Sequence, residues 1–246
     1  MSGLAVIILA AGKGTRMKSD LPKVFHEILG EPMLTYVLET VKKLAPRLTL
    51  LVVGHKRDLI MDYYKDWKMK FVSQEQQLGT GHAVMQARSD LEDFSGTVLV
   101  LAGDVPLLSE KTLRELIDFH VKNKAAATDL TAVLKDAGNY GRVVRKKSGE
   151  ILKIVEKKDA SPEELKINEI NTGTFCFEKR ALFSALAEVR AENAQQEYYL
   201  TDTIEILRKK NLPVFAFKAD DPSETVGVNT KEELVEIEKA LLKRQG

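Results

Sequence analysis

The sequence is poor in cysteine, in long hydrophobic runs and in any excess of one charge. Its single cysteine, Cys176, excludes an internal disulfide and favours a reducing compartment, so we expect a cytoplasmic protein. No apolar run approaches the roughly 20 residues that cross a bilayer. The 37 Lys and Arg residues balance the 36 Asp and Glu residues, without the basic surplus typical of nucleic-acid-binding or membrane-surface proteins. We therefore expect neither as a partner.

Two apolar segments need a structural explanation. Residues 4–11, LAVIILAA, have the length of a signal-peptide core, but no basic residue precedes them and a charged loop follows. They predict a first strand that is buried on both faces. Cys176 alternates with Phe175 and Phe177, a pattern typical of a buried strand thiol rather than of a nucleophile.

The first half of the chain, residues 1–128, alternates short apolar runs with amphipathic segments. This alternation predicts an α/β fold with a doubly wound, mostly parallel, Rossmann-like sheet. The predicted strands cover residues 3–11, 48–54, 70–74 and 96–104, and the predicted helices cover residues 33–44, 57–67, 81–91 and 109–124, the last capped by Ser109.

The second half, residues 129–230, is richer in strands, and a helix over 231–246 closes the chain. Ser148-Gly149 predicts a hairpin, and Thr230 with Glu233 predicts a capping box for the closing helix. We expect residues 1–230 to form one domain whose two halves share a sheet. The strand-like runs cover 128–134, 141–146, 150–158, 170–178 and 213–219, and helices are predicted at 179–189 and 198–210.

The loop after the first strand combines glycine with positive charge. Gly12 and Gly14 allow backbone N–H groups to approach a ligand and permit positive φ, and successive N–H groups at such a turn attract phosphate oxygens. Lys13, Arg16 and Lys23 add positive charge, and Arg16 can bind a phosphate through two hydrogen bonds. An ordinary turn with solvated basic residues is the alternative.

The same loop fits neither of the two common phosphate-binding motifs. Lys13 is followed by Gly14, where a P-loop needs Ser or Thr. Met17 stands where the third glycine of a dinucleotide-binding fingerprint belongs, and the second strand ends in Val53-Gly54-His55 with no acidic residue for a ribose. An NAD-dependent oxidoreductase is therefore disfavoured.

Asp104 follows a continuous apolar strand and should lie at the carboxyl edge of the sheet, where open α/β sheets bind ligands. A lone carboxylate there suits Mg²⁺, which takes one or two protein oxygens and completes its shell with phosphate and water. A turn or cap aspartate before Pro106 is the alternative. Asn229, before the closing helix, is equally open to a metal-ligand role or a helix-cap role.

Polar side chains at three further places suit the other parts of a nucleotide and a sugar. Gln74 follows a strand, and Gly79 with Thr80 opens a helix, so their amide and backbone groups could read a base edge. A glycine-rich helix entry is the alternative, and His82 is interpreted as part of that entry. In the second half, Gly141, Glu156, Asn171 and the run 198–202 suit sugar hydroxyls, although surface turns explain each of them in isolation.

Taken together, the motifs resemble one family. The sequence is similar to the uridylyltransferase (pyrophosphorylase) domain of the bacterial bifunctional N-acetylglucosamine-1-phosphate uridylyltransferase/glucosamine-1-phosphate acetyltransferases, within the sugar nucleotidyltransferase superfamily. The motif L-A-A-G-x-G-T-R-M-x₄-P-K marks the superfamily, and the later motifs narrow it to this family. They are, in order, LAAGKGTRMKSDLPKVF, QEQQLGTGHA, LAGDVPLL, YGRV, IVEKKDAS, EINTG, EYYLTD and VGVN.

The resemblance implies a nucleotide-diphospho-sugar transferase fold, with a nucleotide-binding half, 1–128, and a sugar-phosphate-binding half, 129–230. It implies that UTP and N-acetylglucosamine 1-phosphate give UDP-N-acetylglucosamine, a cell-wall precursor, and pyrophosphate, with Mg²⁺ as cofactor. The implied roles are catalysis by Arg16, Lys23 and Asp104; nucleotide binding by Leu9, Ala10, Ala11, Gly12, Gly14, Gln74, Gly79, Thr80, Ala102 and Gly103; sugar binding by Gly141, Glu156, Asn171, Tyr199 and Thr201; and metal binding by Asp104 and Asn229.

The sequence departs from the bifunctional pattern in one respect. Members of that type continue into a left-handed β-helix of hexapeptide repeats, which this sequence does not contain. We therefore expect no acetyltransferase activity and, since the β-helix is the usual trimerisation element, a monomer. Two other functions stay open: a nucleotidyltransferase for another sugar phosphate such as glucose 1-phosphate, and a non-catalytic nucleotide-sugar sensor.

Overall fold

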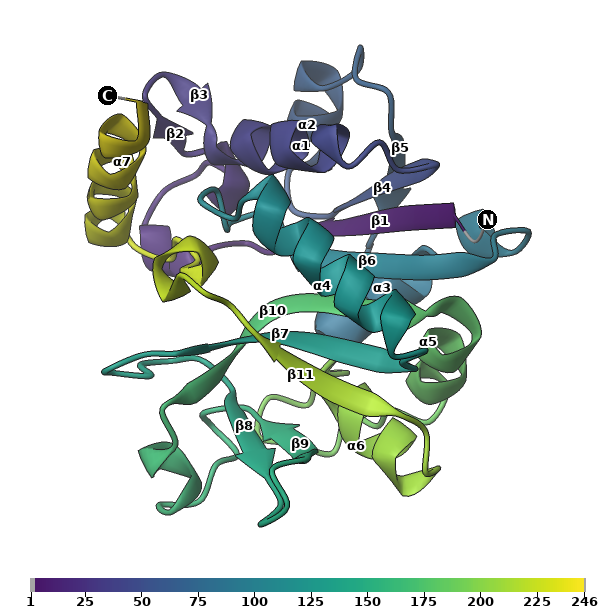
Figure 1. The fold of residues 1–246 in the computed structure, drawn as a ribbon. Helices are drawn as coiled ribbons and strands as arrows, with labels where there is room; N and C mark the ends of the chain where they lie inside the picture. The colour runs from purple at the N-terminus through teal and green to yellow at the C-terminus, as the bar shows by residue number, and fades with distance from the viewer. Residues whose placement is uncertain (1–2, 246) are drawn as a thin grey trace.

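The computed structural model describes residues 3–245, and Figure 1 shows their arrangement. The strands are β1 (Gly3–Ala10), β2 (Glu27–Ile28), β3 (Glu31–Pro32), β4 (Leu48–Val53), β5 (Lys70–Ser73), β6 (Gly96–Ala102), β7 (Ala127–Val133), β8 (Arg142–Arg145), β9 (Ile151–Val155), β10 (Glu169–Glu178) and β11 (Val214–Lys218). The α-helices are α1 (Met33–Lys43), α2 (Arg57–Tyr63), α3 (Thr80–Gln86), α4 (Glu110–Lys122), α5 (Lys179–Leu186), α6 (Asp202–Lys209) and α7 (Lys231–Gln245).

One sheet runs through both halves of the chain, in the order β11-β7-β10-β6-β1-β4-β5. β1 pairs in parallel with β4 and β6, β4 with β5, and β7 with β11. β10 alone on this path runs the other way, antiparallel to β6 and β7, and the β8-β9 hairpin joins the sheet through β10. The predicted α/β fold with a mostly parallel central sheet is confirmed.

Helices cover both faces of the sheet, as a doubly wound arrangement requires. On β1, Val6 and Ile8 face one core and Ala5 and Ile7 the other, so the strand is buried on both sides as its apolar run predicts. The first core is covered by α1, α2 and α4 and the second by α3, α5 and α6 (Figure 1).

Two helices begin at the capping residues that the sequence predicts. The Ser109 hydroxyl accepts from the N–H of Thr112, 3.2 Å away, and Thr230 and Glu233 form the predicted reciprocal box before α7. The helix expected over 198–210 begins only at Asp202. The backbone of Tyr198 is instead paired with the loop before α3, since its N–H donates to Leu78 and its carbonyl accepts from Gly81.

Two further expectations concern burial and membranes. Cys176 is fully buried in β10, and this burial raises the pKa of its thiol, so the interpretation as a core residue is confirmed. Among residues 3–245, no helix combines the length and the apolar character that crossing a membrane requires.

The topology brings several loops to one edge of the sheet. β1 and β6 end side by side, with Leu9 paired to Ala102. Because β10 is antiparallel, its first residues lie at this same carboxyl end, and its register against β7 shifts between Asn171 and Phe175. This bulge and the loops after β1, β5 and β6 surround the candidate site.

Candidate active site

The loop after β1 folds back on itself through two short 3₁₀ turns, Thr15–Met17 and Lys23–Phe25. Gly14 has φ +63° and lies so close to Lys23 that a Cβ on Gly14 would clash with that side chain. Glycine is therefore required there. Gly12 does not adopt a positive φ, but the space where its Cβ would lie is empty, which leaves room for a ligand beside the backbone.

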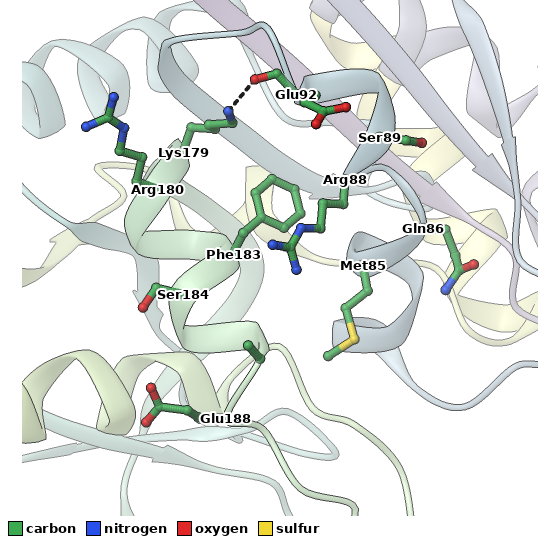
Figure 2. Close-up of a pocket in the computed structure, with 11 residues that line it drawn as sticks. Met85, Gln86, Arg88, Ser89, Glu92, Lys179, Arg180, Phe183, Ser184 and Glu188 are labelled. Carbon is green, nitrogen blue, oxygen red and sulfur yellow. Dashed lines mark hydrogen bonds between the residues drawn. The ribbon is translucent and has the colours of Figure 1, made fainter.

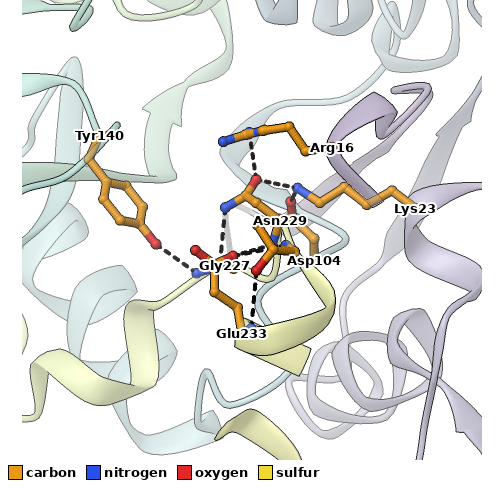
Figure 3. A network of polar contacts seen from close by, with 8 residues as sticks. Arg16, Lys23, Asp104, Tyr140, Gly227, Asn229 and Glu233 are labelled. Carbon is orange, nitrogen blue, oxygen red and sulfur yellow. Dashed lines mark hydrogen bonds and ion pairs between the residues drawn. The ribbon is translucent and has the colours of Figure 1, made fainter. Parts of the chain in front are cut away.

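Four polar side chains meet where this loop, the end of β6 and the segment before α7 converge (Figure 3). The Lys23 ammonium contacts the Asp104 carboxylate and lies 2.7 Å from Oδ1 of Asn229. Arg16 donates to the same Oδ1 from 2.8 Å. The two residues predicted as metal ligands thus direct their oxygens toward one positively charged group.

Backbone hydrogen bonds hold these residues in place. The N–H of Gly103 donates to the carbonyl of Leu9 (2.9 Å), which fixes the start of the Asp104 loop against β1. The N–H of Val228 donates to the carbonyl of Asp104 (2.9 Å), and the Glu233 carboxylate accepts from the N–H of Asn229 (2.6 Å). Asn229 is therefore not the cap residue itself, since the reciprocal box is made by Thr230 and Glu233.

A second wall of the site is built around Gln74, which is buried at the end of β5. Its Nε2 donates to the carbonyl of Gly79 (3.2 Å) and lies 3.0 Å from Nδ1 of His82. Within residues 3–245, no group donates to its Oε1, so this oxygen can accept from a ligand. The Thr80 hydroxyl accepts from the N–H of Leu200 (3.1 Å), which joins this wall to the second half of the chain.

The third wall carries the residues predicted to bind sugar. Glu156 accepts from the Thr201 hydroxyl at 3.2 Å, and burial, the largest cause, raises the pKa of its carboxyl group. A Cβ on Gly141 would lie 3.4 Å from Oε2 of Glu156. Asn171 uses its Oδ1 to accept from the N–H of Gly173 (2.9 Å), which leaves its amide nitrogen without a partner in the described chain.

These three walls enclose a cavity of about 590 Å³. Five predicted residues do not line it: Arg16, Gly103, Gly141, Tyr199 and Asn229. Arg16 and Lys23 both donate to Oδ1 of Asn229, so Asn229 joins Arg16 to the cavity-lining Lys23. Tyr199 is buried, and this burial raises the pKa of its hydroxyl to about 12. Fourteen of the predicted residues line the cavity: Leu9, Ala10, Ala11, Gly12, Gly14, Lys23, Gln74, Gly79, Thr80, Ala102, Asp104, Glu156, Asn171 and Thr201.

Several residues of this site escaped the sequence-based prediction. Gly173, Phe175, Glu197 and Leu200 line the cavity because the β10 bulge and the extended run before α6 bring them there. Tyr140 accepts a hydrogen bond from the N–H of Gly227, near Asp104 and Asn229 (Figure 3). Its position beside Gly141 in the YGRV motif is the only signal that the sequence offered.

A second groove, of about 880 Å³, lies between the end of α3 and the start of α5 (Figure 2). Its side chains carry both charges, the Arg88 guanidinium lies over the ring of Phe183, and Lys179 donates to the carbonyl of Glu92 (2.8 Å). None of the predicted site residues lines it. This groove is larger, but the predicted site residues gather at the cavity at the carboxyl edge of the sheet, which is therefore the candidate active site.

The fold and the cavity define an α/β protein with a ligand site at the carboxyl edge of its sheet, and comparison with known families gives its class. The family model described as nucleotidyl transferase matches residues 5–238, so the chain belongs to the nucleotidyl transferase family.

Among curated proteins, the chain is similar to the bifunctional protein GlmU of several bacteria. It is 49% identical over 238 residues to that of Streptococcus uberis, covering 97% of this chain and 52% of the relative. It is 50% identical over 244 residues to that of Shouchella clausii, covering 99% and 54%. The chain thus spans about half the length of the curated relatives it matches.

Two solved structures share the fold at lower identity. A UDP-glucose pyrophosphorylase complexed with UDP-glucose has a TM-score of 0.74 at 20% identity, covering 99% of this chain and all of that one. HddC from Yersinia pseudotuberculosis has a TM-score of 0.71 at 21% identity, covering 96% and 99%.

Proposed function

We propose that the protein transfers a uridylyl group from UTP to N-acetylglucosamine 1-phosphate, giving UDP-N-acetylglucosamine and pyrophosphate. The observation that carries the proposal is the convergence of Arg16, Lys23, Asp104 and Asn229 beside one cavity. The other walls of this cavity carry Gln74 and Glu156. The relatives named GlmU support the choice of substrates, because nearly the whole chain aligns with them at 49–50% sequence identity.

The reaction needs no general base. A phosphate oxygen of the sugar phosphate is ionised at neutral pH and can attack the α-phosphorus of UTP directly. The bond between this phosphorus and the oxygen that bridges to the β-phosphate breaks, and that oxygen leaves with pyrophosphate. Catalysis then consists of bringing two anions together and stabilising the charge on the transferring group.

The donor set around Lys23 fits a magnesium ion. In the structure, the oxygens of Asp104 and Asn229 already converge on a cation, the Lys23 ammonium. Two protein oxygens are a common set for Mg²⁺, which obtains its other ligands from phosphate and water. Within residues 3–245, no group of three or more His, Cys, Asp or Glu side chains could hold a metal instead. When bound, the ion supplies positive charge to the reacting phosphates.

Lys23 and Arg16 provide the remaining positive charge. Lys23 lines the cavity and lies beside Gly14, at the loop whose backbone faces the proposed triphosphate. Arg16 is exposed at the margin, from where its guanidinium can bind the leaving pyrophosphate through two hydrogen bonds. Both side chains then move from Asn229 to the phosphates of the substrates.

Base selection follows from the orientation of Gln74. Its Nε2 is engaged by Gly79 and His82, so Oε1 is the atom that faces a base. Uracil presents an N3–H donor at the place where cytosine has an acceptor. An accepting amide oxygen therefore favours UTP over CTP.

The sugar is bound by the third wall. The Glu156 carboxylate and the amide nitrogen of Asn171 provide an acceptor and a donor for hydroxyl or acetamido groups, and both residues line the cavity. Thr201 donates to Glu156 and so fixes its orientation.

One assay tests the proposal: pyrophosphate release from UTP and Mg²⁺ with N-acetylglucosamine 1-phosphate or glucose 1-phosphate. We expect release with the acetylated sugar at least tenfold faster in kcat/KM. Faster release with glucose 1-phosphate would support a nucleotidyltransferase for another sugar. UTP binding without release would indicate a sensor.

An accompanying prediction concerns location. We predict that the protein is cytoplasmic, which cell fractionation measures separately from the uridylyl transfer.

A further inference from the structure

The hydroxyl of Tyr140 joins two segments that lie far apart in the sequence. Tyr140 belongs to the loop between β7 and β8, and its oxygen accepts a hydrogen bond from the N–H of Gly227 at 3.0 Å, across 87 positions of the chain (Figure 3). Gly227 precedes α7 and lies beside Asp104, since a Cβ on it would be 3.5 Å from the Asp104 Oδ1.

On the Gly227 side, this hydrogen bond supports the cation-binding residues. The carbonyl of Gly227 accepts from Nδ2 of Asn229 at 3.2 Å. Because Nδ2 is engaged there, Oδ1 is the atom that faces Lys23 and Arg16. The position of Gly227 thus determines which atom of Asn229 is presented to a cation.

On the Tyr140 side, the same loop supports the sugar wall. The buried Arg142 guanidinium donates to the carbonyls of Ala137 and Gly138, both at 3.2 Å, and also to that of Tyr140, so residues 137–142 are tied together and would move as one unit. The next residue, Gly141, packs against Glu156, and its carbonyl accepts from the N–H of Asn171 at 3.0 Å. A ligand that orders Glu156 and Asn171 therefore also orders the loop that carries Tyr140.

We propose that Tyr140 is a positioning residue that couples occupancy of the sugar site to the orientation of Asn229. This proposal rests on the proposed function. Sugar phosphate bound between Glu156 and Asn171 fixes the Tyr140 loop, the hydroxyl fixes Gly227, and Asn229 presents Oδ1 to the metal–triphosphate complex. Since such coupling is reciprocal, each substrate raises the affinity for the other.

The test uses Tyr140→Phe, which keeps the ring and removes only the hydroxyl oxygen. Calorimetry measures the Kd of the Mn²⁺ complex of uridine 5′-(α,β-imido)triphosphate, which cannot release pyrophosphate, with and without saturating N-acetylglucosamine 1-phosphate. In the wild-type protein we expect the sugar phosphate to tighten this Kd by about fivefold or more. In Tyr140→Phe we expect less than half of that factor.

Tyr36→Phe is the matched control. Tyr36 is half-buried like Tyr140, and its hydroxyl likewise makes a hydrogen bond to the backbone, donating to the carbonyl of Ile28 at 2.7 Å, but it lies outside the site. We expect wild-type coupling in this variant. Equal loss of coupling in Tyr36→Phe and Tyr140→Phe would indicate a general effect on stability and overturn the proposal.

A double-mutant cycle shows whether Tyr140 acts through Asn229. In an Asn229→Ala background, we expect Tyr140→Phe to change neither the Kd nor the coupling further, whereas independent residues would give additive effects. Additive effects, or wild-type coupling in Tyr140→Phe, would overturn the proposal while leaving the uridylyl transfer intact. Absence of pyrophosphate release from UTP and sugar phosphate by the wild-type protein would instead overturn the proposed function.

Discussion

The two halves of the sheet position their polar side chains by different means. In the first half, Asp104 and Gln74 each come within two residues of the end of a parallel strand, so the strand direction alone places them at the ligand-binding edge. In the second half, Asn171 lies in a bulged antiparallel strand, and Gly141 lies in a loop that the Arg142 side chain holds. Placement there depends on contacts between distant parts of the chain.

This difference suggests a division of labour that substitutions can test. In the proposed function, the first half together with Asn229 would supply the groups that act on the reacting phosphates, and the rest of the second half would supply neutral and acidic groups suited to a sugar. Changes in the first half should lower kcat or alter base selection. Changes in the second half should raise KM for the sugar phosphate.

We expect the largest effect from Asp104→Asn. The substitution keeps the size of the side chain but removes the negative charge that would hold the metal. Loss of one preorganised charge partner commonly lowers kcat by about 10²–10³. Steady-state pyrophosphate release measures it, with Asp118→Asn on the exposed face of α4 as a control that stays at wild-type activity. An Asp104→Asn enzyme within about tenfold of wild-type kcat would contradict the metal-binding role.

A smaller and different effect is expected from Glu156→Gln in the second half. An amide replaces one of two acceptor oxygens, so the charge-assisted hydrogen bond to a sugar hydroxyl is lost, and KM for N-acetylglucosamine 1-phosphate should rise about tenfold. KM for UTP should stay within about twofold of wild type. Substrate-saturation curves for both substrates check this, and Glu163→Gln, exposed in the same half, is the control. If KM for UTP rises as much as KM for the sugar, the division between the halves is wrong.

Base selection sharpens the comparison within the first half. Gln74→Ala removes the accepting oxygen, so the preference for UTP over CTP in kcat/KM should fall about tenfold, as expected for one lost hydrogen bond. The neighbouring Gln76→Ala changes an exposed side chain and should keep the wild-type preference. An unchanged ratio in Gln74→Ala would remove this residue from the base-binding wall.

The sequence predicted the first half more completely than the second for a physical reason. Alternating apolar runs and amphipathic helices specify a doubly wound sheet, and the sheet then determines the edge at which Asp104 and Gln74 lie. The loop after β1 was also located correctly, and Gly14 has the positive φ that the pattern suggested.

The second half offered fewer local signals. No periodic pattern reveals that β10 runs antiparallel between β6 and β7, or that a bulge places Gly173 in the cavity. The predicted start of the helix, at residue 198, was wrong. The backbone of Tyr198 forms hydrogen bonds with Leu78 and Gly81, and these override the helical pattern of residues 198–201. Such features depend on residues about 40 to 120 positions apart.

Asp129 is the clearest example of a residue whose state the sequence could not reveal. It lies in β7 and is fully buried, and neither carboxylate oxygen has a hydrogen-bond partner among residues 3–245. Burial, more than the neighbouring Glu169, raises the pKa of this carboxyl well above its ordinary value of 3.8. At a pH between the two pKa values, Asp129 therefore keeps its proton in the folded protein and releases it in the unfolded chain.

This proton gives the second half a pH dependence opposite in sign to that of the buried His120 in the first half, whose pKa burial lowers to about 4. Because the native state binds more protons, the stability contribution is fully present below about pH 4. It falls by up to about 1.4 kcal/mol for each further pH unit until the folded-state pKa is passed. Asp129→Asn cannot ionise, so its melting temperature relative to wild type should rise between pH 5 and pH 7, by about 2–4 °C for each kcal/mol. Thermal unfolding at both pH values measures this, with the exposed Asp58→Asn as control. A difference in melting temperature that is the same at both pH values would show that Asp129 does not hold its proton in the folded protein.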